Sequence, residues 1–257
     1  MSGRVAAIIP ARYASTRLPA KPLLAETGKF LIQHVWERVK RARGLVRVVV
    51  ATDDERIAAA VRSFGAEVAM TSPAHQSGTD RVAEVARTLD VDAVVNVQGD
   101  EPDLGIEDLE NVARAVVAAD DAIVTLAVPI RSAETYANPN AVKVVTDRTG
   151  RALYFSRSPI PWTNDAQQAL ASGLLKKHVG VYAFPREILF RFTATPPTTL
   201  ERTERLKQLR ALEHGIAIRV LDAAHDPIGI DTPEDYRKFV ERVRGEPAAG
   251  PRGGERR

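Results

Sequence analysis

Short apolar runs alternate with helical patterns through the first half of the chain, and this alternation constrains the fold most strongly. The runs predict strands at Val5–Ile9, Val46–Ala51, Glu67–Met70 and Ala93–Val97. The amphipathic patterns predict helices over 30–43, 53–64 and 79–89, with Asp53 as the N-cap of the second. Nearly continuous Val/Ile runs are typical of strands covered on both faces, as in parallel sheets. We therefore predict an α/β fold with a doubly wound, Rossmann-like sheet.

The second half changes character, because strand patterns follow one another with little helix between them. These strands are expected at Ala122–Val128, Ala141–Thr146, Ala152–Phe155 and His178–Ala183. Two helices, over 200–214 and 232–244, flank a further strand at 217–221. We expect a mixed sheet with a β-rich extension in the second half. We expect residues 1–244 to form one domain, with a first half over 1–120 and an extension over 121–222. A Gly/Pro-rich, disordered tail is expected over 245–257.

Composition excludes several function classes. The chain has 36 Lys and Arg against 33 Asp and Glu, and the basic residues are scattered. This distribution argues against nucleic-acid binding. Cysteine is absent, which excludes disulfides, cysteine-ligated zinc and a thiol nucleophile and favours a cytoplasmic setting. Pro10 ends the first apolar run long before a signal-peptide or membrane-spanning length is reached, so we expect no membrane insertion.

A cationic loop follows the first strand. It holds Arg12, Arg17 and Lys21 among small residues. In a doubly wound fold this loop lies at the carboxyl edge of the sheet, where ligands bind. Three cations on one short loop repel each other, so a polyanion such as a triphosphate is the natural partner. The loop matches neither GxGxxG nor GxxxxGK[ST], which argues against dinucleotide dehydrogenases and P-loop ATPases. A solvated loop with incidental arginines is the plain alternative.

Two acidic segments are candidates for a metal site. Asp100 follows the strand at 93–97 directly, within Gln98-Gly99-Asp100-Glu101-Pro102. A carboxylate there points into the same crevice, where magnesium commonly bridges carboxylate and phosphate. In Asp231-Thr232-Pro233-Glu234-Asp235, helix capping accounts for Thr232, Pro233 and Asp235. Capping leaves Asp231 without a structural role, so Asp231 is the candidate second ligand of Mg2+.

A polar loop over 71–81 leads into the third predicted helix. Its amide-bearing Gln76 and its exposed backbone groups suit recognition of a nucleotide base. Thr79 is the expected N-cap of the helix. His75 fits a hydrogen-bonded structural role better than a catalytic one.

Several segments, in the same order along residues 4 to 243, resemble the 3-deoxy-manno-octulosonate cytidylyltransferases (CMP-KDO synthetases). The matching segments are IIPARYASTRLP at 8–19, HQSGT at 75–79, NVQGDEP at 96–102, NPNAVKVV at 138–145, ALYFSR at 152–157 and DTPED at 231–235. The resemblance implies a fold of nucleotidyltransferase type. It also implies an enzyme that transfers CMP from CTP to the anomeric hydroxyl of 3-deoxy-D-manno-octulosonate (KDO), releasing pyrophosphate, for lipopolysaccharide biosynthesis.

The resemblance also implies residue roles. Arg12, Lys21 and Asp100 would be catalytic, and Asp100 and Asp231 would bind Mg2+. The nucleotide would contact Arg12, Ser15, Arg17, Lys21, Gln76, Ser77 and Gly78. The sugar acid would contact Gln98, Arg157, His178, Tyr182 and Gln208, with Arg157 suited to its carboxylate. Residues 1–120 would then bind CTP, and 121–222 would bind the sugar and form a homodimer.

Four positions depart from the family pattern, and two of them, Asp103 and Gly105, replace the usual apolar residue and Pro after Glu101-Pro102. Ala20 stands where the family usually has Gly, and Lys207 stands where it usually has Glu beside Gln208. That Glu is expected near sugar hydroxyls. A Lys donates hydrogen bonds where Glu accepts them, and it disfavours an amino-substituted sugar. The sequence therefore leaves open a cytidylyltransferase for a different acidic sugar. A catalytically inactive nucleotide-binding module is a further alternative, although it would be expected to lack the metal carboxylates.

Overall fold

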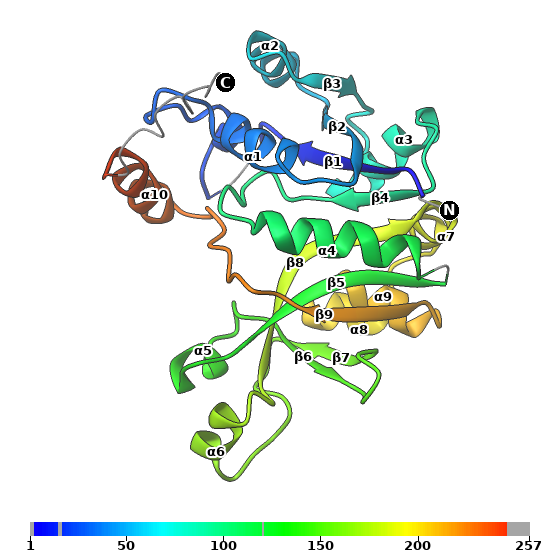
Figure 1. Ribbon diagram of the computed structural model, residues 1–257, viewed down its shortest axis with the longest axis vertical. Helices are drawn as coiled ribbons and strands as arrows, with labels where there is room; N and C mark the ends of the chain where they lie inside the picture. The colour runs from blue at the N-terminus through cyan, green and yellow to red at the C-terminus, as the bar shows by residue number, and fades with distance from the viewer. Residues whose placement is uncertain (1–2, 15–16, 120, 246–257) are drawn as a thin grey trace, which may run out of the picture.

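The computed structural model describes residues 3–14, 17–119 and 121–245. A nine-stranded mixed sheet runs through the molecule (Figure 1), with the main order β3-β2-β1-β4-β8-β5-β9. The strands are β1 (Val5–Ala11), β2 (Leu45–Thr52), β3 (Glu67–Met70), β4 (Ala93–Asn96), β5 (Ala122–Pro129), β6 (Lys143–Thr146), β7 (Ala152–Ser156), β8 (Lys176–Pro185) and β9 (Ala217–Asp222). The predicted α/β fold with a mixed sheet is confirmed. Positions 246–257 of the predicted tail lie outside the described residues.

Helices cover both faces of this sheet. They are α1 (Leu31–Lys40), α2 (Glu55–Ser63), α3 (Gly78–Thr88), α4 (Ile106–Val117), α5 (Ala133–Ala137), α6 (Ala166–Ala171), α7 (Arg186–Ala194), α8 (Thr199–Glu204), α9 (Gln208–Glu213) and α10 (Pro233–Gly245), with the 3-10 turn η1 (Lys21–Leu23). None of the helices in the described ranges is long and apolar enough to cross a bilayer.

Side chains of β1 alternate between two hydrophobic cores. Val5, Ala7 and Ile9 pack into the core beneath α1, α2 and α4, whereas Ala6 and Ile8 pack into the core beneath α3, α7 and α9. A strand presents successive residues to opposite faces, so an apolar run of this kind needs helices on both sides. The continuous run in the sequence therefore has its physical cause in the two layers of helices.

The directions of the strands determine where a ligand-binding crevice can form. Strands β2, β3 and β4 run parallel to their neighbours around β1, and β8 enters antiparallel between β4 and β5. The chain order reverses between β1 and β4. In open α/β sheets, ligands bind beyond the carboxyl ends of the strands at such a switch point.

The sequence pattern misses two long helices and merges two short ones. Helices α4 and α7 occupy segments where no helix is predicted, and both pack apolar side chains against the sheet. The single helix predicted over 200–214 is wrong, because α8 ends at Arg205, which adopts a left-handed conformation with φ 54°. A left-handed residue breaks the helical hydrogen-bond ladder, so α9 starts in a new direction.

Two predicted N-caps are also wrong by one or two residues. Asp54, not Asp53, caps α2, and its Oδ1 accepts from the Arg56 backbone N–H at 2.9 Å. Asp53 instead pairs with the buried Arg81 at 2.9 Å. Ser77, not Thr79, caps α3 and accepts from the Asp80 N–H at 3.3 Å.

The predicted capping of α10 is confirmed by a reciprocal pair of bonds. Thr232 Oγ1 accepts from the Asp235 backbone N–H at 3.1 Å, and Asp235 Oδ2 accepts from the Thr232 N–H at 2.9 Å. Two N–H groups that helix geometry leaves without partners are satisfied in this way. Asp231 makes no side-chain contribution to this cap.

The corrected cap of α2 makes a stability prediction. Asp54→Ala removes the side chain that satisfies the first turn of the helix. We expect the free energy of unfolding to fall by about 1 kcal/mol, measured by urea denaturation. Asp54→Ser keeps an oxygen that can cap and is the matched control, so its loss should be smaller. A loss below about 0.3 kcal/mol in Asp54→Ala would contradict the cap assignment.

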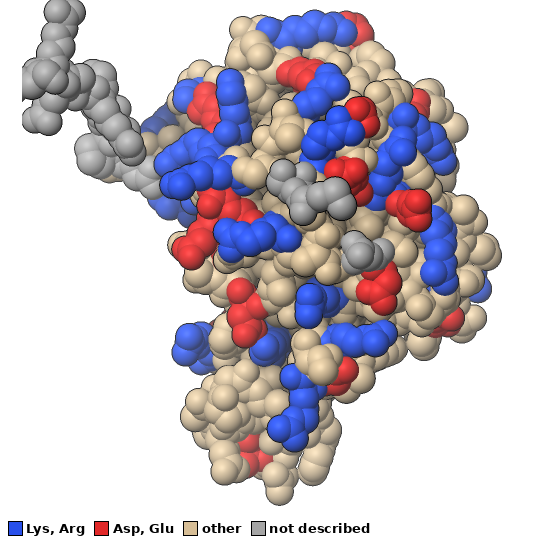
Figure 2. Space-filling model, turned by 45° about the vertical axis from the view of Figure 1, so that its right-hand side comes forward, with Lys and Arg blue, Asp and Glu red and all other residues tan. Residues whose placement is uncertain are grey.

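The strands β6 and β7 form an arm with α5 and α6 at one end of the molecule (bottom of Figure 1). Trp162 and Leu174 on this arm are strongly exposed, at 83% and 57%. Elsewhere, Lys/Arg and Asp/Glu side chains are interspersed on the face that Figure 2 shows, and no single basic patch dominates it. This agrees with the scattered basic residues of the sequence.

Candidate active site

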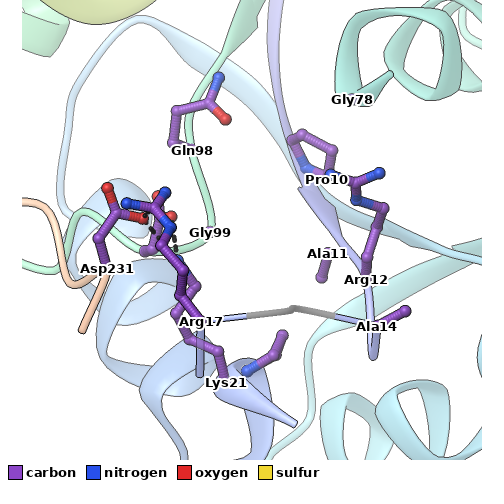
Figure 3. Close-up of a pocket in the computed structure, with 12 residues that line it drawn as sticks. Pro10, Ala11, Arg12, Ala14, Arg17, Lys21, Gly78, Gln98, Gly99 and Asp231 are labelled. Atoms are coloured by element: carbon purple, nitrogen blue, oxygen red, sulfur yellow. Dashed lines mark hydrogen bonds and ion pairs between the residues drawn. The ribbon is translucent and has the colours of Figure 1, made fainter. Parts of the chain in front are cut away.

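A cavity of about 400 Å³ opens beyond the carboxyl ends of β1 and β4 (Figure 3), and we name it the main cavity because the predicted phosphate and metal residues line it, not because of its size. The loop after β1 supplies Arg12, Arg17 and Lys21 to its lining, and the segment after β4 supplies Gln98 and Asp100. Asp231 reaches it from the segment before α10. The volume lies within the range of small-molecule sites. Three segments that are distant in the sequence thus meet at the switch point of the sheet.

Lys21 joins the two predicted metal carboxylates. Its Nζ lies 2.5 Å from Asp100 Oδ2 and 3.3 Å from Asp231 Oδ1, and it also donates to the Ile230 carbonyl at 2.8 Å. A single ammonium can approach both carboxylates only if the two side chains converge. Asp100 and Asp231 therefore lie on the same side of the molecule and face one cationic position.

The two arginines of the loop differ in their surroundings. Arg17 pairs with Asp231, with 2.9 Å between Nη2 and Oδ1. Arg12 stands across the cavity from that pair, near Pro10 and Gly78 (Figure 3). Among the described residues, its guanidinium has no ion-pair or hydrogen-bond partner. Three cations against two carboxylates leave the cavity with one positive charge in excess, which suits an anionic ligand.

Close packing shapes the floor of this cavity. A Cβ added to Gly99 would lie 3.0 Å from the Pro10 carbonyl oxygen, and one added to Gly78 would lie 3.1 Å from Pro10 Cγ. Glycine at both positions therefore lets the two loops close on Pro10. Ala20, one of the departures from the family pattern, adopts φ 54° directly before η1. This left-handed conformation costs an alanine about 1 kcal/mol, and it leads the chain into the turn that carries Lys21.

A second cavity of about 210 Å³, the side cavity, adjoins the main cavity. Gly78 and Gln98 line both, so the two are contiguous. Tyr182, Lys207 and Gln208 line only the side cavity. Aromatic rings of β8 and α7 complete its wall and make it less polar than the main cavity. Three of the five predicted sugar contacts, Gln98, Tyr182 and Gln208, are thus brought together here.

The remaining predicted contacts lie elsewhere. Arg157 lines neither cavity, and its guanidinium donates to the carbonyls of Glu204 and Pro139 at 2.9 and 3.0 Å. His178 lines a separate cavity, between the loop before β6 and the segment before α10. Gln76 donates to the Ala74 carbonyl at 3.2 Å and lines neither the main nor the side cavity. Ser15 lies outside the described residues. Their binding roles stay predictions.

Glu101, next to Asp100, lines the separate cavity of His178 and neither the main nor the side cavity, and sequence reasoning used it only as part of a motif. Its Oε2 is shielded from solvent and has no hydrogen-bond partner among the described residues. Burial raises the pKa of Glu101 to about 8, with the negative charges of Asp100 and Asp231 acting in the same direction. Near neutral pH Glu101 is therefore mostly protonated, and the negative charge at this edge stays on Asp100 and Asp231. The pair Asp100-Glu101 was the available sequence signal.

His178 provides a pH-dependence prediction. Its ring packs against Phe155 and Tyr182 and hydrogen-bonds Thr125 Oγ1 at 2.9 Å. Burial lowers the pKa of His178 from 6.5 to about 3. Between pH 6.5 and about 3, the His178 ring is protonated in the unfolded chain and neutral in the folded protein. Because the unfolded state binds this extra proton, the free energy of unfolding falls as the pH falls through that range.

The test is the acid slope of stability. For His178→Gln we expect a shallower loss of unfolding free energy between about pH 6.5 and 3.5 than in the parent, by up to about 1.4 kcal/mol per pH unit. Urea denaturation across this range measures the slope. Equal slopes in the two proteins would show that the ring takes up its proton in the folded state as well.

Comparison with known proteins agrees with this geometry. The family model described as Cytidylyltransferase matches residues 6–218. A 3-deoxy-manno-octulosonate cytidylyltransferase of Geobacter sulfurreducens is 50% identical over 93% of this chain and 99% of its own length. One from Pelobacter propionicus is 50% identical over 93% and 97%. The chain belongs to the 3-deoxy-manno-octulosonate cytidylyltransferase family.

A solved structure supports the same family assignment. The structure of CMP:2-keto-3-deoxy-manno-octonic acid synthetase complexed with CTP has a TM-score of 0.88 with this chain and is 41% identical to it. The match covers 94% of this chain and 98% of that one. Likeness to the 3-deoxy-manno-octulosonate cytidylyltransferase family thus extends over nearly the whole chain and is not confined to its first half.

Proposed function

We propose that this protein transfers CMP from CTP to the anomeric hydroxyl of 3-deoxy-D-manno-octulosonate, releasing pyrophosphate. The observation that carries the proposal is the convergence of Asp100 and Asp231 on one cation in the cavity that also holds Arg12 and Arg17. Relatives that span nearly the whole chain bear the name of this activity. An inactive nucleotide-binding module is disfavoured, because both acidic residues are in place.

The main cavity suits the nucleotide. Arg12 has an unpartnered guanidinium within the described ranges, and Arg17 and Lys21 can exchange their carboxylate partners for phosphate oxygens. Charge-assisted hydrogen bonds to phosphate are stronger than neutral ones, and guanidinium binds phosphate in a bidentate way. Gly78, in the N-terminal turn of α3, lines the cavity, and this turn with Ser77 is the proposed contact for the nucleoside.

Asp100 and Asp231 fit a magnesium ion. Both offer the hard carboxylate oxygens that Mg2+ prefers, and Lys21 Nζ already stands as a cation between them. No cluster of three or more His, Cys, Asp or Glu able to hold a metal occurs in the described ranges. Two carboxylates completed by phosphate oxygens and water are the usual magnesium environment in phosphoryl-transfer sites. When bound there, Mg2+ would offset charge on the α-phosphate and lower the pKa of the attacking hydroxyl.

The reaction consists of one in-line displacement. The anomeric oxygen forms a bond to the α-phosphorus of CTP while the bond from that phosphorus to the bridging oxygen breaks, and the hydroxyl proton passes to solvent. Arg12 and Lys21 offset the charge that grows on the departing pyrophosphate. Gln98, at the junction of the two cavities, would orient the sugar toward the phosphorus. Positioning and charge neutralisation dominate catalysis of this kind.

The broader setting is part of the same proposal. Residues 1–120 would bind CTP, and 121–222 would bind the sugar and form a homodimer, for which the exposed Trp162 and Leu174 are the natural contact surface. The protein would act in the cytoplasm, where CTP is available. Its product would supply activated KDO for lipopolysaccharide.

The direct test is pyrophosphate release with CTP, Mg2+ and KDO. We expect turnover with KDO to exceed that with a sialic acid, and turnover with CTP to exceed that with UTP. Pyrophosphate release with a sialic acid but not with KDO would assign the chain to another acidic sugar. A rise in melting temperature with CTP and Mg2+, without pyrophosphate from any sugar acid, would point to a binding module.

A further inference from the structure

Lys207 is the one charged residue that lines the side cavity among the described residues. The rest of the lining is aromatic, aliphatic, amide or hydroxyl, and no carboxylate of the described ranges contributes to it. Its ion-pair partner Asp80 lies 3.4 Å away and does not line the cavity, so the ammonium is the charge that a ligand there meets. In a partly apolar wall the surroundings screen this charge less than water does. Lys207 is therefore the residue of this cavity with the greatest influence on ligand charge.

The fold holds the Lys207 ammonium in place. The left-handed Arg205 ends α8 and places Lys207 at the start of α9. The Nζ donates to Ser77 Oγ, lies 3.4 Å from Asp80 Oδ1, and stands 5.6 Å from the centre of the Phe192 ring. Its side chain is 25% exposed. An ammonium has three donors, so at least one remains for a ligand in the cavity.

The chemistry of the substrate decides which of its groups meets Lys207. In a 2-keto-3-deoxy sugar acid, the carboxylate is attached to the same carbon as the anomeric hydroxyl. That hydroxyl must reach the α-phosphorus, so the carboxylate stays near the main cavity with Gln98 and the cations of the first loop. The hydroxyl-bearing part of the sugar is then the part that extends past Gly78 and Gln98 into the side cavity. This step rests on the proposed function.

We propose that Lys207 sets the sugar specificity of this site: its ammonium donates to a hydroxyl oxygen on the part of the sugar remote from the anomeric carbon, and it excludes sugars that carry an ammonium there. The ammonium can only donate hydrogen bonds, so it binds a hydroxyl oxygen and repels a second cation. An acidic side chain at position 207 would invert this preference.

The electrostatic surroundings agree with this role. Burial lowers the pKa of Lys207, and the neighbouring positive charge of Arg210 acts in the same direction, whereas Asp80 and Glu201 offset part of the effect. Asp80 faces the ammonium from α3, Glu201 from α8 and Arg210 from α9. An oxygen acceptor from the ligand would replace part of the hydration that burial removes. A ligand ammonium would add to the effect of Arg210.

The test uses a graded series at one position: K207R, K207Q and K207E. Each full-length variant is assayed for pyrophosphate release with KDO and with a KDO analogue in which the terminal hydroxyl is replaced by a primary amine. The readout is the ratio of kcat/KM for KDO to kcat/KM for the amine. KM for CTP is measured in parallel, and circular dichroism confirms folding.

We expect the parent to prefer KDO by about tenfold or more, and K207R to retain that order. K207Q should bring the ratio close to one, and K207E should favour the amine. If K207E misfolds beside Asp80, the double variant D80N/K207E relieves the repulsion, and K207Q alone still tests the proposal. The proposal would be overturned if the ratio of kcat/KM for KDO to kcat/KM for the amine stayed constant across the series. It would also be overturned if the substitutions raised only KM for CTP. Failure of the proposed function is distinct, because the parent itself would then release no pyrophosphate with KDO.

Discussion

Asp100→Asn should lower kcat for pyrophosphate release by about a hundredfold or more. The Asp100 carboxylate lies 2.5 Å from Lys21 Nζ and faces Asp231 across the same cation position. Asparagine keeps the size of the side chain but removes one of the two negative charges that would hold Mg2+. The reaction would lose a preorganised charge at the α-phosphate, whereas the fold would keep its shape.

The measurement is a magnesium titration of initial rate at saturating CTP and KDO. Asp90→Asn is a matched control, since Asp90 is an exposed carboxylate that pairs with Arg4, beyond the opposite end of β4. We expect the magnesium titration of Asp90→Asn to match that of the parent. Asp100→Asn should need a higher Mg2+ concentration to reach half of its own maximal rate. A variant with near-parental kcat at limiting Mg2+ would remove Asp100 from the metal site.

Arg12→Ala should raise KM for CTP by roughly tenfold to a hundredfold, the range expected for losing one or two hydrogen bonds to a charged group. Arg12 lines the main cavity opposite the paired Arg17 and Asp231, and its guanidinium has no partner within the described ranges. The change breaks no ion pair seen there, so the loss should appear in nucleotide binding and not in stability.

Steady-state kinetics with CTP as the varied substrate measures this change, with KM for KDO as an internal comparison. Arg43→Ala supplies the control, because Arg43 is 93% exposed and its Glu110 partner is 3.9 Å away. If KM for CTP stays at its parental value in Arg12→Ala, the triphosphate binds elsewhere, and the proposed role of the first loop is wrong.

Much of the main cavity could be predicted from local sequence. A strand that ends in a loop with Arg12, Arg17 and Lys21, and another that ends at Asp100, must present those residues at the same edge of a parallel sheet. The third contributor, Asp231, was predicted only by elimination, because capping explained its neighbours. Its approach to Lys21 depends on how the segment before α10 crosses the sheet, and a short-range pattern carries no information about that path.

The side cavity was harder to predict. Arg157 has the right charge for an acid, yet its guanidinium is bound to the carbonyls of Pro139 and Glu204. Those partners are brought to it by the packing of distant segments. His178 and Tyr182 are four residues apart in β8, and their rings pack together with 5.2 Å between centroids, as residues on one face of a strand do, yet they line different cavities. Which cavity each ring lines depends on the segments packed around it, namely the loop before β6 beside His178, and α7 and α9 beside Tyr182. Spacing along β8 carries no information about those segments.

By itself, the sequence determined the α/β class, the positions of the first strands along the chain and the charges at their carboxyl ends. The spacing of apolar residues and the charges of side chains are local properties of the sequence. Strands that are buried on both faces permit few arrangements other than a sheet covered by helices on both sides. Only the tertiary structure decided the meeting of Asp231 with Lys21, the break between α8 and α9, and the placement of Lys207 beside Ser77. Each of these depends on side chains far apart in the chain, whose mutual distances are set by packing rather than by spacing along the sequence.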